Sequence, residues 1–396
     1  MADDLLSIAQ ARAAILEHVA PLGRDELPVE QALGRILAEI VTAAGDVPAL
    51  ANSAMDGYAV RSGPAGRTLE LVGEARAGAA FAGQVGDGEA VRISTGAALP
   101  AGADAVLQQE LADADPADGT VTLGDDVAPG RNVRAAGSDV AAGDAVLRAG
   151  TTLGPAELGV AVAAGRATLQ VGRLATVAIL TTGDELVAPG EPLEPGQLHD
   201  SNAVALATLA RSAGARVALV RRVPDLRDAT RAAISQALAS ARIILLSGGV
   251  SVGPHDHVKA ALEHLGVDQV FWRVALRPGK PTWFGTYGER LVFGLPGNPV
   301  SSMVTFLLFV RPALLALQGG DPSPTPGRAR LAQPIERHAG RDEAVRVRLA
   351  DGLATPTGDQ SSHRLTSMLG ADALAIVPRG EGTLPAGADV DLELLP

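Results

Sequence analysis

An uninterrupted aliphatic run, residues 243–246, leads directly into Ser247-Gly248-Gly249, and this junction strongly constrains the fold. Four consecutive large aliphatic residues are typical of a strand that is buried on both faces of a parallel sheet. The glycines that follow have no Cβ, so the backbone there can adopt positive φ and approach a ligand closely. Open α/β sheets bind ligands beyond the carboxyl ends of their strands. The sequence therefore predicts a buried strand with a ligand-facing turn at its end.

The same succession of strand, turn and helix recurs between residues 173 and 320. Strands are expected over 175–180, 217–220, 243–246, 271–276 and 291–295, and helices near 201–209, 227–240, 256–265 and 301–317. Ser201 or Asn202 could cap the first of these helices. This alternation predicts a doubly wound, mostly parallel α/β domain over residues 173–320.

Short β-type runs separated by turn residues occupy two other parts of the chain. Residues 46–137 predict a small inserted β domain, and residues 328–396 predict a small barrel-like β domain at the C-terminus. Helical spacing over 5–20 and 29–38, and again after residue 138, predicts a mixed, helical N-terminal scaffold. This scaffold would comprise residues 1–45 and 138–172.

Composition narrows the class of protein. A net charge of −12 argues against non-specific binding of nucleic acid, because the phosphate backbone is also negative. The absence of cysteine excludes disulfides, thiolate metal sites and Cys nucleophiles. The first residues lack the basic region of a signal peptide, and no uninterrupted apolar run reaches the roughly 18 residues that a membrane span requires. We therefore expect a cytoplasmic protein that binds neither nucleic acid nor a membrane.

Carboxylates follow three of the expected strands. Glu185, Asp225 and Asp256 each come after a strand end, so a parallel sheet would bring them to one edge. Carboxylates alone would repel a phosphate, whereas carboxylates with Mg²⁺ would hold one, because the metal bridges both kinds of oxygen. The residues predict a Mg²⁺-assisted site for an anionic, phosphorylated ligand, with these three side chains as metal ligands.

Backbone amides and cations would complete this site. The turn over residues 296–299 precedes a helix whose N-terminus would attract an anion. Arg273, Arg277 and Lys280 add fixed positive charge from a neighbouring strand. The candidate ligand-binding residues of this domain are Gly183, Ser247, Gly248, Gly249, Ser251, Gly253, Arg273, Arg277, Lys280, Pro296, Gly297, Asn298, Pro299 and Ser301.

Other chemistries have less support in the sequence. A phosphate-binding-loop lysine motif and a dinucleotide-binding glycine motif are both absent. His255 and His257 could bind zinc, but no third ligand stands out. Ser247 and Ser251 lack the context of a nucleophile elbow. We interpret His199 as a loop residue rather than a base.

Two segments of the inserted β domain are unusual for plain structure. Residues 52–60 place Asp56 among turn-forming and aromatic residues, and residues 94–97 place Thr95 after a strand. Taken singly, Asp56 fits a turn residue before glycine, and Thr95 fits a hydroxyl at a strand end.

Seven segments nevertheless form a recognisable series in chain order. They are Asn52-Ser-Ala-Met-Asp-Gly-Tyr-Ala-Val-Arg61, Thr95-Gly-Ala97, Thr182-Gly-Asp-Glu-Leu186, Asp200-Ser-Asn202, Ser247-Gly-Gly-Val-Ser-Val-Gly253, Pro278-Gly-Lys-Pro281 and Leu295-Pro-Gly-Asn-Pro-Val-Ser301. Over nearly the whole chain, the series resembles the molybdopterin molybdenumtransferases, the molybdenum insertases that include the E domain of gephyrin. Molybdopterin adenylyltransferases resemble the 247–253 segment alone.

The resemblance implies a homodimeric enzyme of molybdenum cofactor biosynthesis with four domains per subunit, in which the N-terminal scaffold would serve dimerisation. Such enzymes take adenylylated molybdopterin and molybdate and release AMP and molybdenum cofactor, with Mg²⁺ assisting pyrophosphate cleavage. Tungstate is nearly the same size as molybdate, so the sequence is compatible with either oxyanion. Molybdopterin adenylyltransferase and acceptor molybdoenzymes would be further partners.

The resemblance also implies a composite active site between the α/β domain of one subunit and the inserted β domain of the other. Asp56 and Thr95 would then be catalytic together with Glu185, Asp225 and Asp256.

Further positions follow from the same resemblance. Asp139 resembles another acidic position that the family uses. Arg341, Arg346 and Ser362 resemble C-terminal residues that reach toward the cleft and bind the ligand.

The chain departs from its relatives at four positions. Arg273 and Arg277 stand where many relatives have Lys, which keeps the charge but changes how an oxyanion would be held. Ala51 stands where relatives often have Asp, and Ser361 where they often have Gly.

Two alternative functions stay open. The chain could catalyse the adenylyltransferase step itself, in which case it would consume ATP with bare molybdopterin. It could also be a non-catalytic scaffold, which would bind molybdopterin without converting it.

Overall fold

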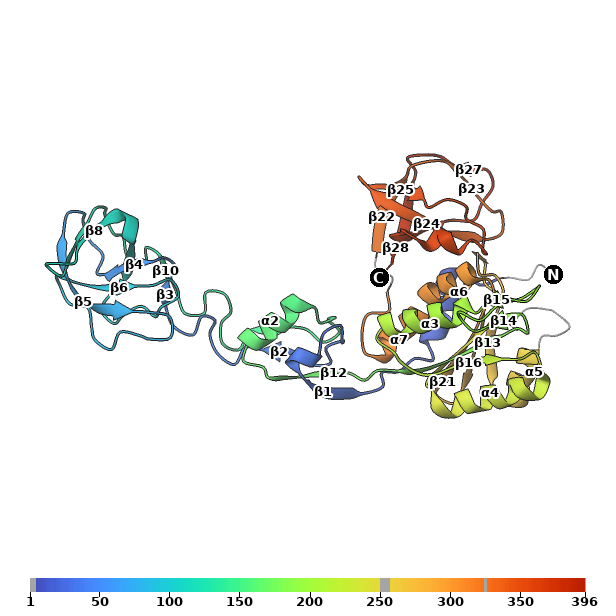
Figure 1. Cartoon of the computed structure of the whole chain (residues 1–396). Helices are drawn as coiled ribbons and strands as arrows, with labels where there is room; N and C mark the ends of the chain where they lie inside the picture. Colours follow the sequence, from blue (N-terminus) through green and yellow to red (C-terminus); the bar gives the residue numbers. More distant parts are fainter. Residues whose placement is uncertain (1–4, 250–256, 324–325, 396) are drawn as a thin grey trace. The chain divides into compact units, whose positions relative to one another are not determined.

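The computed structural model describes residues 5–249, 257–323 and 326–395. The chain forms two compact units (Figure 1). Unit 1 contains Met1–Glu26, Gly34–Ala38 and Gln170–Pro396, and unit 2 contains Leu27–Leu33 and Glu39–Leu169.

Unit 1 contains a six-stranded sheet. Its strands, in spatial order, are β16 (Arg216–Val223), β13 (Thr176–Thr182), β17 (Ile243–Ser247), β21 (Arg290–Leu295), β20 (Trp283–Tyr287) and β18 (Asp268–Trp272). The first four are parallel, and β20 runs antiparallel to both of its neighbours. The parallel strands therefore end at one edge of the sheet.

Helices cover both faces of this sheet. One face carries α1 (Ile8–Leu16), α3 (Ser201–Ser212), α6 (Pro299–Thr305), the π-helix η3 (Phe306–Val310) and α7 (Arg311–Leu317). The other carries α4 (Arg227–Ser240) and α5 (His257–His264). Residues 243 and 245 pack into the first layer, and residues 244 and 246 pack into the second. The aliphatic run is thus continuous because β17 is buried on both faces.

One helical segment of the described chain, Pro299–Leu317, is long and apolar enough to cross a membrane by length and composition. It has 19 residues and a mean hydropathy of 1.9, yet 78% of it is buried inside the protein. Its apolar side chains pack into the core of the α/β sheet, so this segment behaves as a core helix.

A small barrel follows in the same unit. The strands β24 (Asp342–Ala350), β25 (Leu353–Pro356), β22 (Pro326–Leu331), β28 (Asp389–Leu394) and β26 (Ala373–Val377) form a ring, which a pairing between β24 and β26 closes. Short elements β23 (Ile335–Glu336), β27 (Thr383–Leu384) and η4 (Leu365–Met368) flank it. The short strand β19 (Leu276–Arg277), from the α/β region, pairs in parallel with β24.

Unit 2 is built around a second six-stranded sheet. Its spatial order is β7 (Ala105–Gln108), β4 (Gly57–Val60), β6 (Glu89–Ile93), β5 (Thr68–Ala75), β9 (Thr120–Leu123) and β8 (Ala112–Asp115). Smaller elements are η1 (Val29–Gln31), β2 (Val41–Thr42), β3 (Asn52–Ser53), η2 (Gln109–Leu111), β10 (Val133–Arg134), β11 (Ala145–Leu147) and α2 (Pro155–Ala163). Strands β1 (Arg24–Pro28) and β12 (Thr168–Gly172) pair where the chain passes between the units.

The N-terminal segment differs from expectation. Residues 5–26 belong to unit 1, whereas residues 138–169 belong to unit 2. The buried residues Ala11 and Ile15 of α1 pack into the α/β core, and Arg12 forms an ion pair with Glu393 of the barrel at 2.8 Å. The helix expected over 29–38 is wrong: only η1 forms, because the chain turns at Gly34 with a φ of 73°.

Three boundaries in the α/β region also differ. Asp200 caps α3, since its carboxylate accepts the Ala203 N–H at 3.0 Å. The long helix begins at Pro299, two residues earlier than expected. The strand expected over 271–276 is split into β18 and β19 around Arg273, whose φ of 77° interrupts the extended backbone.

Candidate active site

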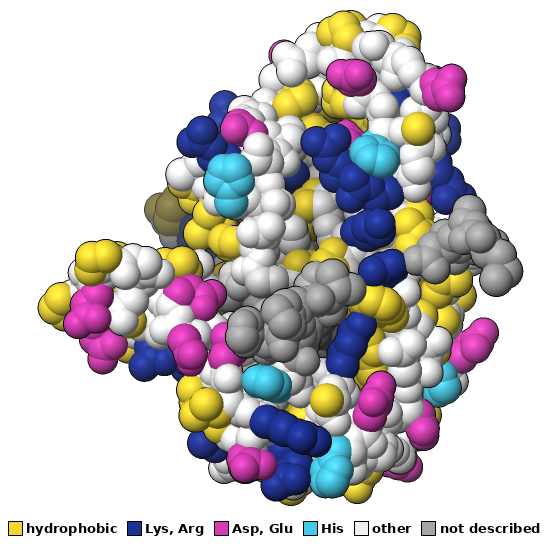
Figure 2. Space-filling model, turned by 90° about the vertical axis from the view of Figure 1, so that its right-hand side faces the viewer, with side chains coloured by type: hydrophobic (Ala, Val, Ile, Leu, Met, Phe, Trp, Pro, Cys, Tyr) yellow, Lys and Arg dark blue, Asp and Glu magenta, His cyan; other side chains and the backbone are white. Residues whose placement is uncertain are grey.

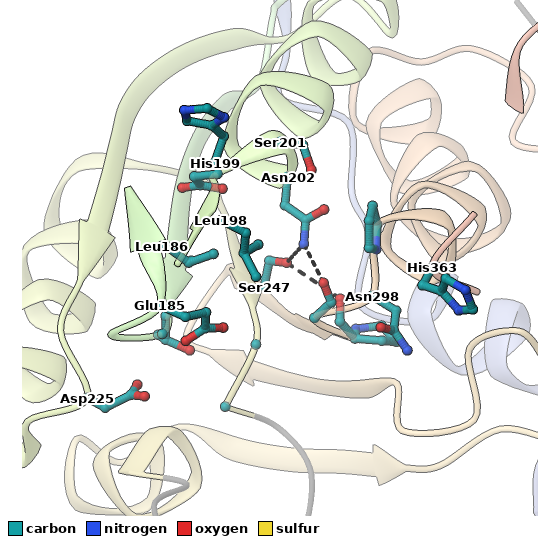
Figure 3. A pocket seen from close by; sticks show the side chains of 18 of the residues that line it. Glu185, Leu186, Leu198, His199, Ser201, Asn202, Asp225, Ser247, Asn298 and His363 are labelled. Carbon is teal, nitrogen blue, oxygen red and sulfur yellow. Dashed lines mark hydrogen bonds between the residues drawn. The ribbon is translucent and has the colours of Figure 1, made fainter. Parts of the chain in front are cut away.

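A cavity of about 810 Å³ opens beyond the carboxyl ends of β13, β17 and β21 (Figure 3). The turns after these strands supply most of its wall, and the short strands β14 (Leu186–Val187) and β15 (Leu198–His199) add to it. The lining residues are Thr182, Gly183, Glu185, Leu186, Leu198, His199, Asp200, Ser201, Asn202, Asp225, Ser247, Gly248, Gly249, Pro281, Pro296, Gly297, Asn298, Pro299 and His363.

Two carboxylates predicted from the sequence, Glu185 and Asp225, line this cavity on the same side (Figure 3). The Asp225 N–H donates to the Asp184 carboxylate at 3.0 Å, which fixes the turn after β16. A Cβ on Gly183 would fall 2.5 Å from a Glu185 carboxylate oxygen, so glycine leaves room for that side chain. The local backbone therefore holds both acidic groups at the cavity wall.

The glycine turn after β17 has the backbone conformation that the sequence predicts. Gly248 and Gly249 have φ values of 93° and 66°. A Cβ on Gly248 would lie 2.7 Å from the Thr182 carbonyl oxygen, and one on Gly249 would lie 2.6 Å from Val258 Cγ2. The Gly248 N–H donates to the Leu295 carbonyl at 3.2 Å, which ties this turn to the end of β21.

The turn over residues 296–299 is held by the barrel. Asn298 Nδ2 donates to Ser362 Oγ at 3.0 Å, and the Val300 N–H donates to the Ser362 carbonyl at 3.2 Å. His363 reaches the cavity wall from the same segment. Ser301, by contrast, is buried within α6 and is absent from the cavity wall.

The donor set suits a magnesium ion with a phosphorylated ligand. Glu185 and Asp225 supply hard carboxylate oxygens, and Mg²⁺ is commonly bound through one or two carboxylates together with substrate phosphates. Within the described ranges, no group of three or more His, Asp or Glu side chains converges on one point. Asp256, Ser251, Gly253 and His255 lie outside the described residues.

The predicted cations lie outside the cavity wall. Arg273 stacks over the ring of Trp272, with its guanidinium carbon 4.0 Å from the ring centroid. Arg277 forms an ion pair with Glu343 at 2.6 Å, as their positions on β19 and β24 require. Of the segment 278–281, Pro281 lines the cavity and the exposed Lys280 does not.

Arg341 adds to this positive region. Burial lowers its pKa, the nearby charge of Arg277 lowers it further, and Glu343 opposes both effects. Figure 2 shows Lys and Arg side chains gathered over the barrel and the adjoining α/β region of unit 1. This local positive charge contrasts with the net charge of −12 of the chain.

Arg346 lies inside the barrel rather than in the cavity wall. It is 1% exposed, and its guanidinium donates to Ser367 Oγ at 3.2 Å and to the Ala344 carbonyl at 3.4 Å. Within the described parts of the chain, its Nη2 has no hydrogen-bond partner. Burial lowers the pKa of Arg346 to about 10, despite opposing effects of Asp359 and Glu343. The expected role in ligand binding therefore has no support from its position.

We expect Arg346→Met to keep the free energy of unfolding within about 1 kcal/mol of wild type, because burying an unpaired guanidinium offsets its packing. Arg346→Ala should lose about 3 kcal/mol through the cavity it leaves. Calorimetric unfolding would measure both. Normal stability of Arg346→Met combined with loss of ligand binding would show instead that this arginine touches the ligand.

Asp56 and Thr95, predicted from the resemblance, meet in unit 2. Both the N–H and the hydroxyl of Thr95 donate to one Asp56 carboxylate oxygen, at 2.6 and 3.0 Å. The backbone bond, and next the side-chain bond, lower the pKa of Asp56. Asp56 thus remains ionised at lower pH than an ordinary aspartate.

Thr95→Val should raise the pKa of Asp56, because the valine removes the hydroxyl donor that favours the carboxylate. The value should stay below that of an ordinary aspartate, since the backbone donor remains. A carbon-13 NMR titration of the Asp56 carboxyl group in both proteins would measure the shift. An unchanged pKa would contradict the role of the hydroxyl.

Comparisons with known proteins fit this geometry. Family models for the MoeA N-terminal region (domain I and II), a probable molybdopterin binding domain and the MoeA C-terminal region (domain IV) match residues 6–165, 178–316 and 328–395. The molybdopterin molybdenumtransferase of Haemophilus influenzae is 36% identical over 98% of both chains. That of Bacillus subtilis is 35% identical over 96% of this chain and 91% of its own.

The chain belongs to the molybdopterin molybdenumtransferase family. Among solved structures, the molybdopterin biosynthesis moeA protein of Pyrococcus horikoshii OT3 superposes with a TM-score of 0.85. It is 28% identical and covers 99% of this chain and 100% of its own.

Sequence reasoning overlooked several residues of the cavity wall. Asn202 was predicted only as a possible helix cap, and Asp200 only as part of a segment shared with relatives, although both line the cavity together with the carboxylates. Their place in that shared segment was the signal that could have identified them. His363 carries no comparable signal, because it reaches the cavity only through the docking of the barrel.

Proposed function

We propose that this chain inserts molybdenum from molybdate into adenylylated molybdopterin and releases AMP and the molybdenum cofactor. The observation that carries the proposal is the cavity at the sheet edge. Two carboxylates there share the wall with the turns after β17 and β21, within the region that matches a probable molybdopterin binding domain. A volume of about 810 Å³ is within the range of sites for ligands of this size.

Glu185 and Asp225 would hold Mg²⁺, and Asp256 is proposed as the third ligand. The bound metal would neutralise phosphate charge and polarise the pyrophosphate. Gly248, Gly249 and residues 296–299 would position the ligand through their backbone.

Arg277 lies on β19 beside β24, and its charge is near that of Arg341. We propose that these two cations attract the oxyanion. Glu343 pairs with Arg277 at 2.6 Å and keeps the guanidinium directed toward β24. Lys280, Arg273 and Ser362 complete the proposed anion-binding set.

The enzyme is further proposed to act as a homodimer, in which Asp56 and Thr95 of one copy complete the site of the other. A groove of about 520 Å³ between α3 and β16 supports a second copy, because it exposes apolar side chains. Val204 and Val220 there are 55% and 44% exposed. Asp139 is proposed as an additional acidic residue of the composite site.

The proposed organisation follows the three matched regions. Residues 46–137 would act as the inserted β domain, 173–320 as the pterin-binding domain and 328–396 as the C-terminal domain. We place the enzyme in the cytoplasm, where adenylylated molybdopterin would reach it from an adenylyltransferase and the product would pass to acceptor molybdoenzymes.

Purified wild-type protein should release AMP from adenylylated molybdopterin only when both molybdate and Mg²⁺ are present. Chromatographic quantification of AMP would measure this, with and without a chelator. Consumption of ATP with bare molybdopterin would identify an adenylyltransferase instead. Tight binding of the pterin without AMP release would identify a scaffold. An active monomer by light scattering would contradict the dimer.

A further inference from the structure

Asn202 connects two turns that are far apart in the sequence. Its Nδ2 donates to Ser247 Oγ at 2.9 Å and to the Gly297 carbonyl at 2.7 Å (Figure 3). Ser247 ends β17, whereas Gly297 lies in the turn after β21. Because a carbonyl can only accept, the atom facing Gly297 must be the amide nitrogen. One side-chain amide therefore holds both ligand-facing turns.

The base of Asn202 is itself fixed. It lies in the first turn of α3, whose start is held by Asp200. The Asp200 carboxylate accepts the Ala203 N–H at 3.0 Å and the Thr181 hydroxyl at 2.5 Å, and the residue is buried. Thr181 belongs to β13, so α3 is anchored to the sheet directly behind Asn202.

The backbones of the two turns lie close together. A Cβ on Gly297 would lie only 3.7 Å from Gly248 Cα, so the backbones are nearly in contact. The Gly248 N–H reaches across to the Leu295 carbonyl at 3.2 Å. Ser247 Oγ also donates to the Pro296 carbonyl, at the long distance of 3.5 Å. Loss of the Asn202 bridge would therefore leave this long bond and the Gly248 bond as the hydrogen bonds between the described parts of the two segments.

The amide oxygen of Asn202, Oδ1, is buried. It is shielded from solvent and has no hydrogen-bond partner among the described residues, although Asn202 lines the cavity. An orphan buried acceptor destabilises the fold. The two hydrogen bonds that the Asn202 nitrogen donates offset this cost.

We propose that Asn202 is a positioning residue that sets the spacing of the 247–249 and 296–299 turns for the pterin nucleotide. The effect of Asn202 on AMP release rests on the proposed function. The effect of Asn202 on the spacing of the turns does not.

The test compares Asn202→Asp and Asn202→Ala with Gln318→Glu. Gln318 is a matched control, because its Nε2 also donates to two acceptors, the Ala213 and Leu314 carbonyls, at 3.1 and 2.9 Å. Gln318 is buried and contacts the C-terminal end of α3, away from the cavity. All three variants should lower the unfolding temperature. If Asn202→Asp does not fold, Asn202→Ala provides the comparison.

Two readouts separate positioning from stability. Hydrogen exchange of the Gly248 amide in ligand-free protein should accelerate in both Asn202 variants and stay at the wild-type rate in Gln318→Glu. In the AMP-release assay, KM for adenylylated molybdopterin should rise about tenfold or more in the Asn202 variants alone. Unchanged Gly248 exchange would overturn the positioning role. Faster exchange with an unchanged KM would overturn its relevance to the ligand. If wild type releases no AMP, the proposed function fails, and the exchange result still decides the positioning role.

Discussion

Glu185→Gln should lower AMP release by about 100-fold or more at saturating Mg²⁺, because it removes a carboxylate that we propose binds the metal and orients the reacting groups. The substitution keeps the size of the side chain, so packing around Gly183 should not change. Asp225→Asn should act in the same direction. Both variants should also require more Mg²⁺ for half-maximal rate.

Glu191→Gln is the matched control for this experiment. Glu191 is in the same loop, accepts the Ala188 N–H at 3.1 Å and is absent from the cavity wall. Its substitution should leave the rate and the Mg²⁺ dependence unchanged. Equal effects of the two glutamine substitutions would show that loop structure, rather than the Glu185 charge, matters.

A mixing experiment extends this prediction to the proposed dimer. Asp56→Asn and Glu185→Gln should each be inactive alone. After random reassembly of equal amounts, activity should recover to about one quarter of wild type, because half of the dimers are mixed and each has one intact site. No recovery under conditions that exchange wild-type subunits would contradict a site shared between copies.

Gly248→Ala should lower the free energy of unfolding by about 3 kcal/mol, from strain at positive φ together with overlap against a backbone oxygen. The φ is 93°, and the added Cβ would lie 2.7 Å from the Thr182 carbonyl oxygen. That oxygen belongs to β13 and cannot move aside as a flexible side chain would. The displaced turn should also abolish ligand binding.

Gly266→Ala separates strain from overlap. Gly266 has a φ of 76° with nothing within 4 Å of an added Cβ, so its substitution should cost about 1 kcal/mol from strain alone. Urea unfolding followed by tryptophan fluorescence would measure both variants. The only tryptophans of the chain, Trp272 and Trp283, lie in the α/β sheet and report on it. Equal losses in the two variants would contradict the role of the Thr182 contact.

The local pattern of the sequence was sufficient for the central strand and its turn. Alternate residues of the 243–246 run face opposite helical layers. A strand buried on both faces therefore needs an apolar residue at every position of the run. Gly248 and Gly249 adopt positive φ, as their position after the strand predicts. Glu185 and Asp225 meet in one cavity because the ends of parallel strands meet at one edge. These features depend on periodicity and backbone freedom, which are encoded locally.

Other features depended on which surfaces the folded chain buries together. Local spacing indicated helix for residues 29–38, but the glycine turn at Gly34 overrode it. Arg346 carries the same charge as Arg341 in the sequence, yet it is enclosed in the barrel. The sequence around Arg12 does not predict its ion pair with Glu393, which lies 381 residues away in the chain.

The junction of residues 243–249 therefore has two levels of explanation. The sequence by itself determined a buried strand, a glycine turn and their place at the ligand-binding edge, because each follows from short-range sterics and hydrophobic patterning. Only the tertiary structure decided that Asn202, from another helix, holds this turn against Gly297. A hydrogen bond between groups 95 residues apart follows from the packing of α3 on the sheet, which no local pattern specifies.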